Sequence, residues 1–157
     1  MVQPYELDAI DERLIAALAL FPRVGMLQIA REIGVARNTA QAHLDRLIRE
    51  GVITGFGPEL DLRRLGYGVS AFVTLEIAQG RGPAVDGHLA AIPEVVEAYM
   101  TTGSSDLLCR VVARDNDHLG QLVSRIVDLP GITRTTTALI LATRIAPRSR
   151  DVVHAGP

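Results

Sequence analysis

Residues 29–51 read IAREIGVARNTAQAHLDRLIREG, a pattern that predicts the end of one short helix, a tight break and a longer second helix. The short helix is expected over Met26–Ile33, and Gly34 ends it. The longer helix is expected over Ala36–Glu50, where apolar residues recur at helical spacing and Gly51 follows.

A further helix is expected upstream, over Leu7–Leu20, because five apolar residues there recur at helical spacing. Downstream, Ile53–Phe56 can turn as a small wing. Three short helices on one apolar core, with a short break containing Gly34 before the third, place a helix in the major groove of DNA. We therefore predict a winged helix-turn-helix DNA-binding domain over residues 1–57.

The composition bounds the class of protein. The chain has 157 residues, of which 48% are hydrophobic, and this excess indicates a buried interface between subunits. No apolar run approaches the ~18 residues of a membrane span, and no signal peptide is visible, so we expect a cytoplasmic protein. With the predicted DNA-binding domain, we expect it to act at the nucleoid of a bacterial cell. Cys109 is the single cysteine and is expected to be buried as a small hydrophobe.

Charge is segregated within the first domain. The chain carries a net charge of −2, and residues 1–57 contain six Arg against seven Asp or Glu. The acids cluster at the start of the first helix, whereas three of the Arg residues lie on the third. One copy would bind phosphate weakly, so we expect a homo-oligomer.

The second half of the chain predicts an α+β domain over residues 67–147, joined by a linker of residues 58–66. The expected order is strand Tyr67–Ile77, helix Pro83–Ala91, strands Val95–Thr101 and Asp106–Ala113, helix Asn116–Val127 and strand Ile132–Ile145. This βαββαβ order is the ferredoxin-like arrangement, with helices on one face of the sheet, and a second copy is the simplest cover for the other face. Residues 148–157 are expected to form a frayed tail.

Five short motifs carry a resemblance to a known family. They are LDxxD at 7–11, IAREIGV at 29–35, RLxxEGVI at 46–53, TGSSD at 102–106 and LPGI at 129–132. In this order and spacing the chain resembles the Lrp/AsnC transcription regulators. The resemblance implies a DNA-binding domain followed by an effector and oligomerisation domain, dimers that often assemble to octamers, and an amino acid or related metabolite as effector.

The third helix supplies the candidate contacts to double-stranded DNA. Arg suits guanine, Asn and Gln suit adenine, and a small Ala can meet a thymine methyl group. The candidates are Arg37, Asn38, Thr39, Gln41 and Ala42 for bases, and His43, Arg46 and Arg49 for phosphates or nearby edges. The alternative is an ordinary solvated helix face, in which Arg46 pairs with Glu50. If the helix does bind DNA, Asp45 is expected to point away from it, because its charge would repel phosphate.

The segment Met100–Asp106 is the candidate effector site. Gly103 allows an unusual backbone bend, free amides could hold a carboxylate, and Asp106 could take an α-ammonium group. The resemblance places the other wall of the pocket on the last strand. The candidates are Met100, Thr102, Gly103, Ser104, Ser105, Asp106, Thr135, Thr137 and Leu139. The alternative is a β-turn in which Asp106 is a local hydrogen-bonding residue.

Two positions depart from the family pattern. Ala36 stands where Ser often precedes the recognition helix, so Asn38 is expected to cap that helix instead. Ser105 stands where an aromatic residue usually precedes the Asp, a change that would enlarge the pocket or alter its specificity.

Other functions are weighed against the regulator. The four His residues show no metal-binding spacing, no catalytic constellation stands out, and no cofactor is expected. One alternative is an enzyme similar to the sirohaem decarboxylases, which resemble this family. Another is an oligomerisation module with vestigial DNA binding, suggested by the acidic balance of the first domain.

Overall fold

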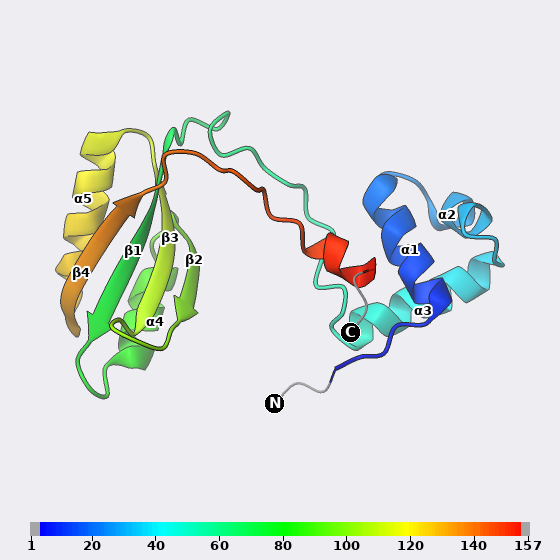
Figure 1. Ribbon diagram of the computed structural model, residues 1–157, viewed down its shortest axis with the longest axis horizontal. Coiled ribbons are helices and arrows are strands. Elements are labelled where there is room, and N and C mark those ends of the chain that lie inside the picture. The colour runs from blue at the N-terminus through cyan, green and yellow to red at the C-terminus, as the bar shows by residue number, and fades with distance from the viewer. Residues whose placement is uncertain (1–3, 155–157) are drawn as a thin grey trace. The chain divides into compact units, whose positions relative to one another are not determined.

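The computed structural model describes residues 4–154, which fall into two compact units (Figure 1). One unit ends at Pro58 and also takes in the segment that begins at Ile145, whereas the other runs from Glu59 to Arg144. Over the described range, the helices are all too short or too polar to cross a membrane.

Three helices make up most of the first unit: α1 at Ala9–Leu20, α2 at Met26–Glu32 and α3 at Arg37–Arg49. All three predicted helices are confirmed, with ends shifted by one or two residues. The start of α1 is a capping box, because the Asp8 side chain accepts from the amide of Asp11 and the Asp11 side chain accepts from the amide of Asp8.

The start of α3 differs from expectation. Ala36 is the N-cap residue in an extended conformation, no side chain caps the helix, and Asn38 lies inside it. The prediction that Asn38 caps this helix is therefore wrong. The break from α2 brings Ala36 into the N-cap conformation, and the exposed amides at the helix start can bond to water or to a ligand.

The predicted wing does not form a hairpin. Residues 51–53 form a turn after α3, and no strand is assigned over 54–60. A two-stranded hairpin is marginal by itself, and Gly55, Gly57 and Pro58 contribute little to strand pairing.

The second unit has the predicted βαββαβ order. Its elements are β1 at Val69–Ile77, α4 at Gly82–Ala90, β2 at Val95–Met100, β3 at Leu107–Ala113, α5 at Asn116–Val127 and β4 at Ile132–Leu139. The strands form an antiparallel sheet in the order β2-β3-β1-β4. The α+β fold class is therefore confirmed.

Both helices of this unit pack on the same face of the sheet. Val73 and Cys109 from the sheet are fully buried against Val85 of α4 and Leu122 of α5. Burial raises the pKa of the Cys109 thiol to about 11, so this residue is the inert small hydrophobe that its apolar run predicted.

The last strand is shorter than its composition suggested. A strand was expected to continue to Ile145, but β4 ends at Leu139. Its neighbour β1 pairs Ala71 with Leu139, and the final contact is the bond from the Ile140 amide to the Ser70 carbonyl. Beyond this point β1 has only Val69 left, so β-branched composition cannot extend the strand to Ile145.

The expected tail of residues 148–157 is described only as far as His154. Within it, Ser149–His154 form a short 3₁₀ helix, η1, which contacts α1 of the first unit, and residues 155–157 lie outside the described residues. Within this helix, Val152 is exposed and Val153 is half-buried. The segment therefore belongs to the same compact unit as the three N-terminal helices.

Candidate functional site

One face of α3 is an exposed polar stripe. Asn38, Ala42, Asp45 and Arg49 follow one another at steps of three or four residues, which places them on one side of a helix. All four are exposed, whereas Ala40 and Leu47, on the opposite side, are completely buried. We call these four residues the α3 stripe.

Two further candidate DNA contacts flank this stripe, and a third is hydrogen-bonded to it. Arg37 and Thr39 are exposed at the start of the helix. Gln41 donates from its side-chain amide to Asp45 Oδ1 at 2.8 Å, which orders both side chains. Asp45 therefore lies on the stripe, contrary to the expectation that it points away from this surface.

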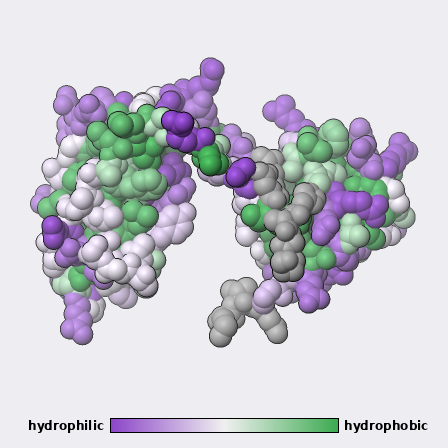
Figure 2. All heavy atoms as spheres, in the orientation of Figure 1, coloured by the Kyte–Doolittle hydropathy of each residue, from purple (hydrophilic) through white to green (hydrophobic). Residues whose placement is uncertain are grey.

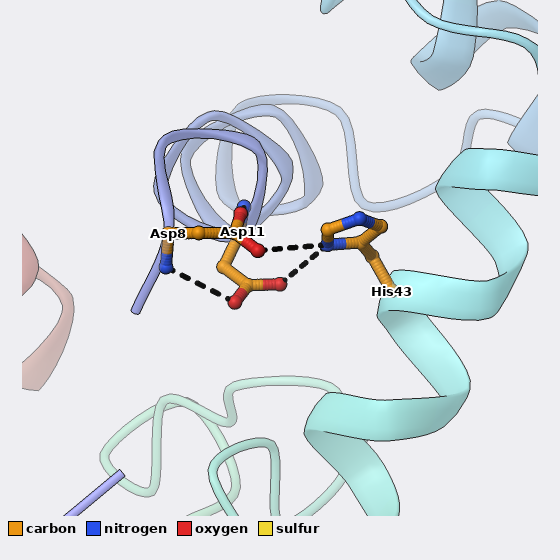
Figure 3. Close-up of side chains that lie close together, drawn as sticks. All are labelled: Asp8, Asp11 and His43. Carbon is orange, nitrogen blue, oxygen red and sulfur yellow. Dashed lines mark hydrogen bonds and ion pairs between the residues drawn. The ribbon is translucent and has the colours of Figure 1, made fainter. Parts of the chain in front are cut away.

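His43 and Arg46 lie on another flank of α3, where they contact the start of α1. His43 Nδ1 lies 2.8 Å from Asp11 Oδ1, and Figure 3 shows the imidazole pointing at the paired carboxylates. Arg46 Nη2 donates to Asp8 Oδ2 at 2.7 Å and to Asp11 Oδ2 at 2.9 Å. The alternative partner of Arg46, Glu50, instead lies 3.6 Å from Arg49.

These contacts change the proton affinity of the acids. Hydrogen bonds from the backbone amide of Asp11 and from Arg46 lower the pKa of Asp8. Burial alone would raise the pKa of Asp11, but hydrogen bonds from His43 and Arg46 outweigh burial and lower it. Hydrogen bonds to both carboxylates raise the pKa of Arg46, so all three groups are charged at neutral pH.

Asp8, Asp11 and His43 are also residue types that bind metal ions. Their ligand atoms lie within 4.8 Å of one another, and they are the one such group within residues 4–154. Arg46 Nη2, however, lies 2.7–3.0 Å from the oxygens of both carboxylates. The guanidinium supplies the positive charge that these acids need, so we assign the group to ion pairing.

The second candidate site is a small polar pocket on the sheet of the other unit. Its volume is about 190 Å³, and β1, β4 and the loop between β2 and β3 form it. The lining residues are Thr74, Glu76, Ser104, Ser105, Arg134, Thr135 and Thr136. Thr74 pairs with Thr136 and Glu76 with Arg134, so these four side chains share the sheet face opposite the helices.

The loop between β2 and β3 is held against β1. Gly103 has φ +114°, a conformation that side chains other than glycine rarely adopt. Asp106 Oδ2 accepts from the Ile77 amide at 2.6 Å, and the Asp106 amide donates to the Leu75 carbonyl. The Asp106 side chain thus bonds to the neighbouring strand β1, 29 residues away in the chain, and not within its own loop.

The predicted effector residues are only partly brought together. Ser104, Ser105 and Thr135 line the pocket, whereas Met100, Thr102, Gly103, Asp106, Thr137 and Leu139 do not. Met100 lines a separate groove of about 420 Å³ between α4 and β2. Thr137 and Leu139 pair with Val73 and Ala71, whose side chains face the helices.

Sequence reasoning missed the two charged residues of the pocket. Arg134 Nη1 lies 3.7 Å from Glu76 Oε1, and both side chains are exposed. Alternation of apolar and polar residues along Val69–Ile77 is a signal that could have placed Glu76 on the outward face. Arg134 could have been placed opposite it only with the register between β1 and β4, which no local pattern provides.

Comparison with known proteins matches both units. Residues 7–54 match the model described as winged helix-turn-helix DNA-binding, and residues 70–149 match the Lrp/AsnC ligand binding domain. An HTH-type transcriptional regulator of Pyrococcus horikoshii is 31% identical over 137 residues, which cover 87% of this chain and 91% of that protein.

Solved structures agree with these matches. The structure of Escherichia coli AsnC has a TM-score of 0.85 at 27% identity, covering 93% of this chain and 99% of that chain. A Neisseria meningitidis transcriptional regulator, solved in complex with L-Met, shares the fold with a TM-score of 0.80 at 17% identity, over 90% and 94% of the two chains.

The matched relatives are transcription regulators and not enzymes, so the alternative of a sirohaem decarboxylase is not supported. Both halves of the chain match the corresponding halves of such regulators, in the same order along the sequence. The chain therefore belongs to the Lrp/AsnC family, as a DNA-binding transcription regulator with a ligand-binding domain.

Proposed function

We propose that α3 enters the major groove and recognises bases through the α3 stripe and the residues beside it. The observation that carries this proposal is the exposed stripe, polar at Asn38, Asp45 and Arg49, opposite the completely buried Ala40 and Leu47. The proposed base contacts are made by Arg37, Asn38, Thr39, Gln41 and Ala42, and Arg49 contacts phosphate. His43 and Arg46 are left out of this set because the acids of α1 bind them.

Asn38→Ala tests the base contacts. Selection of bound duplexes from a randomised library gives the preferred sequence of the wild-type protein. The loss of one bidentate contact of about 1–3 kcal/mol should reduce affinity for that duplex about 5- to 150-fold. Affinity for a scrambled duplex should hardly change. The matched variant Arg49→Ala should weaken binding to both duplexes and reduce the salt slope by about one. Equal losses on both duplexes for Asn38→Ala would contradict the assignment.

We infer that the protein works as a dimer that assembles further, up to an octamer. The sheet carries helices on one face only, and Phe72 and Tyr99 are exposed on the other. Figure 2 shows a hydrophobic area on this unit in the view in which the sheet faces the reader. A second copy covering this face would give two DNA-binding units and a roughly palindromic site. Sedimentation velocity that shows only monomers would contradict this assembly.

We infer that the effector is an α-amino acid or a related metabolite held in the pocket on the sheet. Arg134 can bind a carboxylate and Glu76 an ammonium group, while Ser104 and Ser105 supply further polar contacts. The L-Met complex of the Neisseria meningitidis protein supports an amino acid as the class of ligand.

Because the protein acts on chromosomal DNA, we place it in the cytoplasm. The matched relatives are archaeal as well as bacterial.

Arg134→Ala tests the pocket. The twenty amino acids are first screened by calorimetry against the wild-type protein, and the best ligand is then titrated into the variant. The loss of a charge-assisted hydrogen bond of about 1.5–3 kcal/mol should weaken binding about 10- to 150-fold. Arg144→Ala, an exposed arginine outside the pocket lining, is the matched control and should bind like wild type. An affinity for Arg134→Ala within twofold of the control would place the ligand elsewhere.

A further inference from the structure

A completely buried carboxylate joins α1 to α3 and takes no part in the proposed base contacts. Asp11 has no exposed surface, yet it is ionised and bonded to two side chains of α3. Its Oδ1 lies 2.8 Å from His43 Nδ1, and its two oxygens lie 3.0 and 2.9 Å from Arg46 Nη2. Figure 3 shows the Asp11 side chain between Asp8, at the start of α1, and the imidazole of His43 on α3.

The apolar core holds α3 in place but defines its rotation less sharply than polar contacts do. Ala40 and Leu47 are completely buried, and Leu44 packs beside them while half-buried. Apolar burial is non-directional, so it tolerates a small rotation of α3 about its axis better than hydrogen bonds do. Hydrogen bonds between charged groups, by contrast, weaken steeply when distance or angle changes.

Asp11 is itself fixed to the start of α1. Its Oδ2 accepts from the Asp8 amide at 3.2 Å as part of the capping box, and the Tyr5 hydroxyl donates to the same oxygen at 3.3 Å. His43 and Arg46 are three residues apart and therefore lie on one flank of α3. Two bonds from one anchored carboxylate to one flank define how far α3 is rotated relative to α1.

We infer that Asp11 is a positioning residue for DNA recognition, because it sets the rotation of α3 that turns the α3 stripe outward. Recognition sites must be held within about 10–20° of their working geometry, and supporting hydrogen bonds usually provide this. The inference rests on the proposed DNA surface and adds a residue that does not touch DNA. His43 and Arg46 of α3 then serve orientation rather than phosphate binding.

Asp11→Asn is the direct test, because it keeps the size of the side chain and removes its charge. Glu6→Gln is the matched control, since it makes the same charge change at an exposed position before α1. For each variant, affinity is measured for the duplex selected by the wild-type protein and for a scrambled duplex, and the ratio of the two is the specificity. Circular dichroism checks that each variant is folded at the assay temperature.

Asp11→Asn should lower the specificity at least tenfold, while its affinity for the scrambled duplex matches that of Glu6→Gln. A merely structural role would reduce the folded fraction, which lowers both affinities by the same factor and leaves the specificity unchanged. A folded Asp11→Asn protein with a specificity within twofold of the control would overturn the inference. A wild-type protein without sequence preference would overturn both this inference and the proposed function.

A second variant decides the case in which Asp11→Asn does not fold. Asp8→Asn keeps a good N-cap residue for α1 but removes the partner at 2.7 Å from Arg46. With Arg46 held by Asp11 alone, the specificity should fall at least threefold relative to Glu6→Gln. An unchanged specificity in Asp8→Asn would count against the inference.

Discussion

Leu47→Ala should lower the free energy of unfolding of the DNA-binding unit by about 2–5 kcal/mol, because it removes a large, completely buried side chain from a small core. Leu47 belongs to one buried cluster with Leu14 of α1 and Ile29 of α2, so its truncation leaves a cavity in the core that all three helices share. DNA binding should be lost near the growth temperature as the unit unfolds.

Ile48→Ala is the matched control for this variant. Ile48 is the next residue along the same helix, but 45% of its surface is exposed, so its truncation should change stability by no more than about 1 kcal/mol. Differential scanning calorimetry of the full chain measures both variants. The transition of the ligand-binding unit should not move in either, because the two units have separate cores. Equal effects of the two substitutions would show that Leu47 does not support the core.

Gly131→Ala should destabilise the ligand-binding unit by about 2–5 kcal/mol, the sum of backbone strain and overpacking. Gly131 has φ +103°, which a residue with a side chain adopts only under strain. An added Cβ would lie 2.7 Å from Arg81 Cβ at the start of α4, where the backbone must shift to make room. The Gly131 carbonyl also accepts from the Ala78 amide, so this shift disturbs the beginning of β4.

Gly120→Ala provides the opposite expectation within the same unit. Gly120 lies inside α5, is exposed, and has open space where a Cβ would be added. Alanine is the better helix former, so this change should stabilise the unit by about 0.5–1 kcal/mol. Thermal unfolding of both variants therefore compares the same chemical change at two backbone conformations. A neutral Gly131→Ala would mean that the close approach to Arg81 relaxes freely.

The helices were predictable because the information for them is local. The apolar spacing between Leu7 and Leu20 and the glycine after the third helix both act within a few residues, and the structure confirms them. The order of strands and helices followed from the same kind of pattern. The end of β4 did not, because it depends on where β1 begins, some seventy residues earlier in the chain.

The difference between local and long-range information also decides which parts of the candidate sites could be predicted. Sequence alone placed the exposed residues of α3 correctly on one helix, but the partners of Arg46 lie 35 and 38 residues away. A local view could pair Arg46 only with Glu50, one turn along the helix. The pocket shows the same limit, since Glu76 and Arg134 meet through strand pairing across 58 residues of chain.

The contact between η1 and α1 makes the ligand-binding unit an insertion within the DNA-binding one. Residues up to Pro58 and residues 145–154 belong to the same unit, so its two parts can meet only after residues 59–144 have been synthesised. Its three helices can form early, whereas the docking of residues 149–154 on α1 must wait for that synthesis.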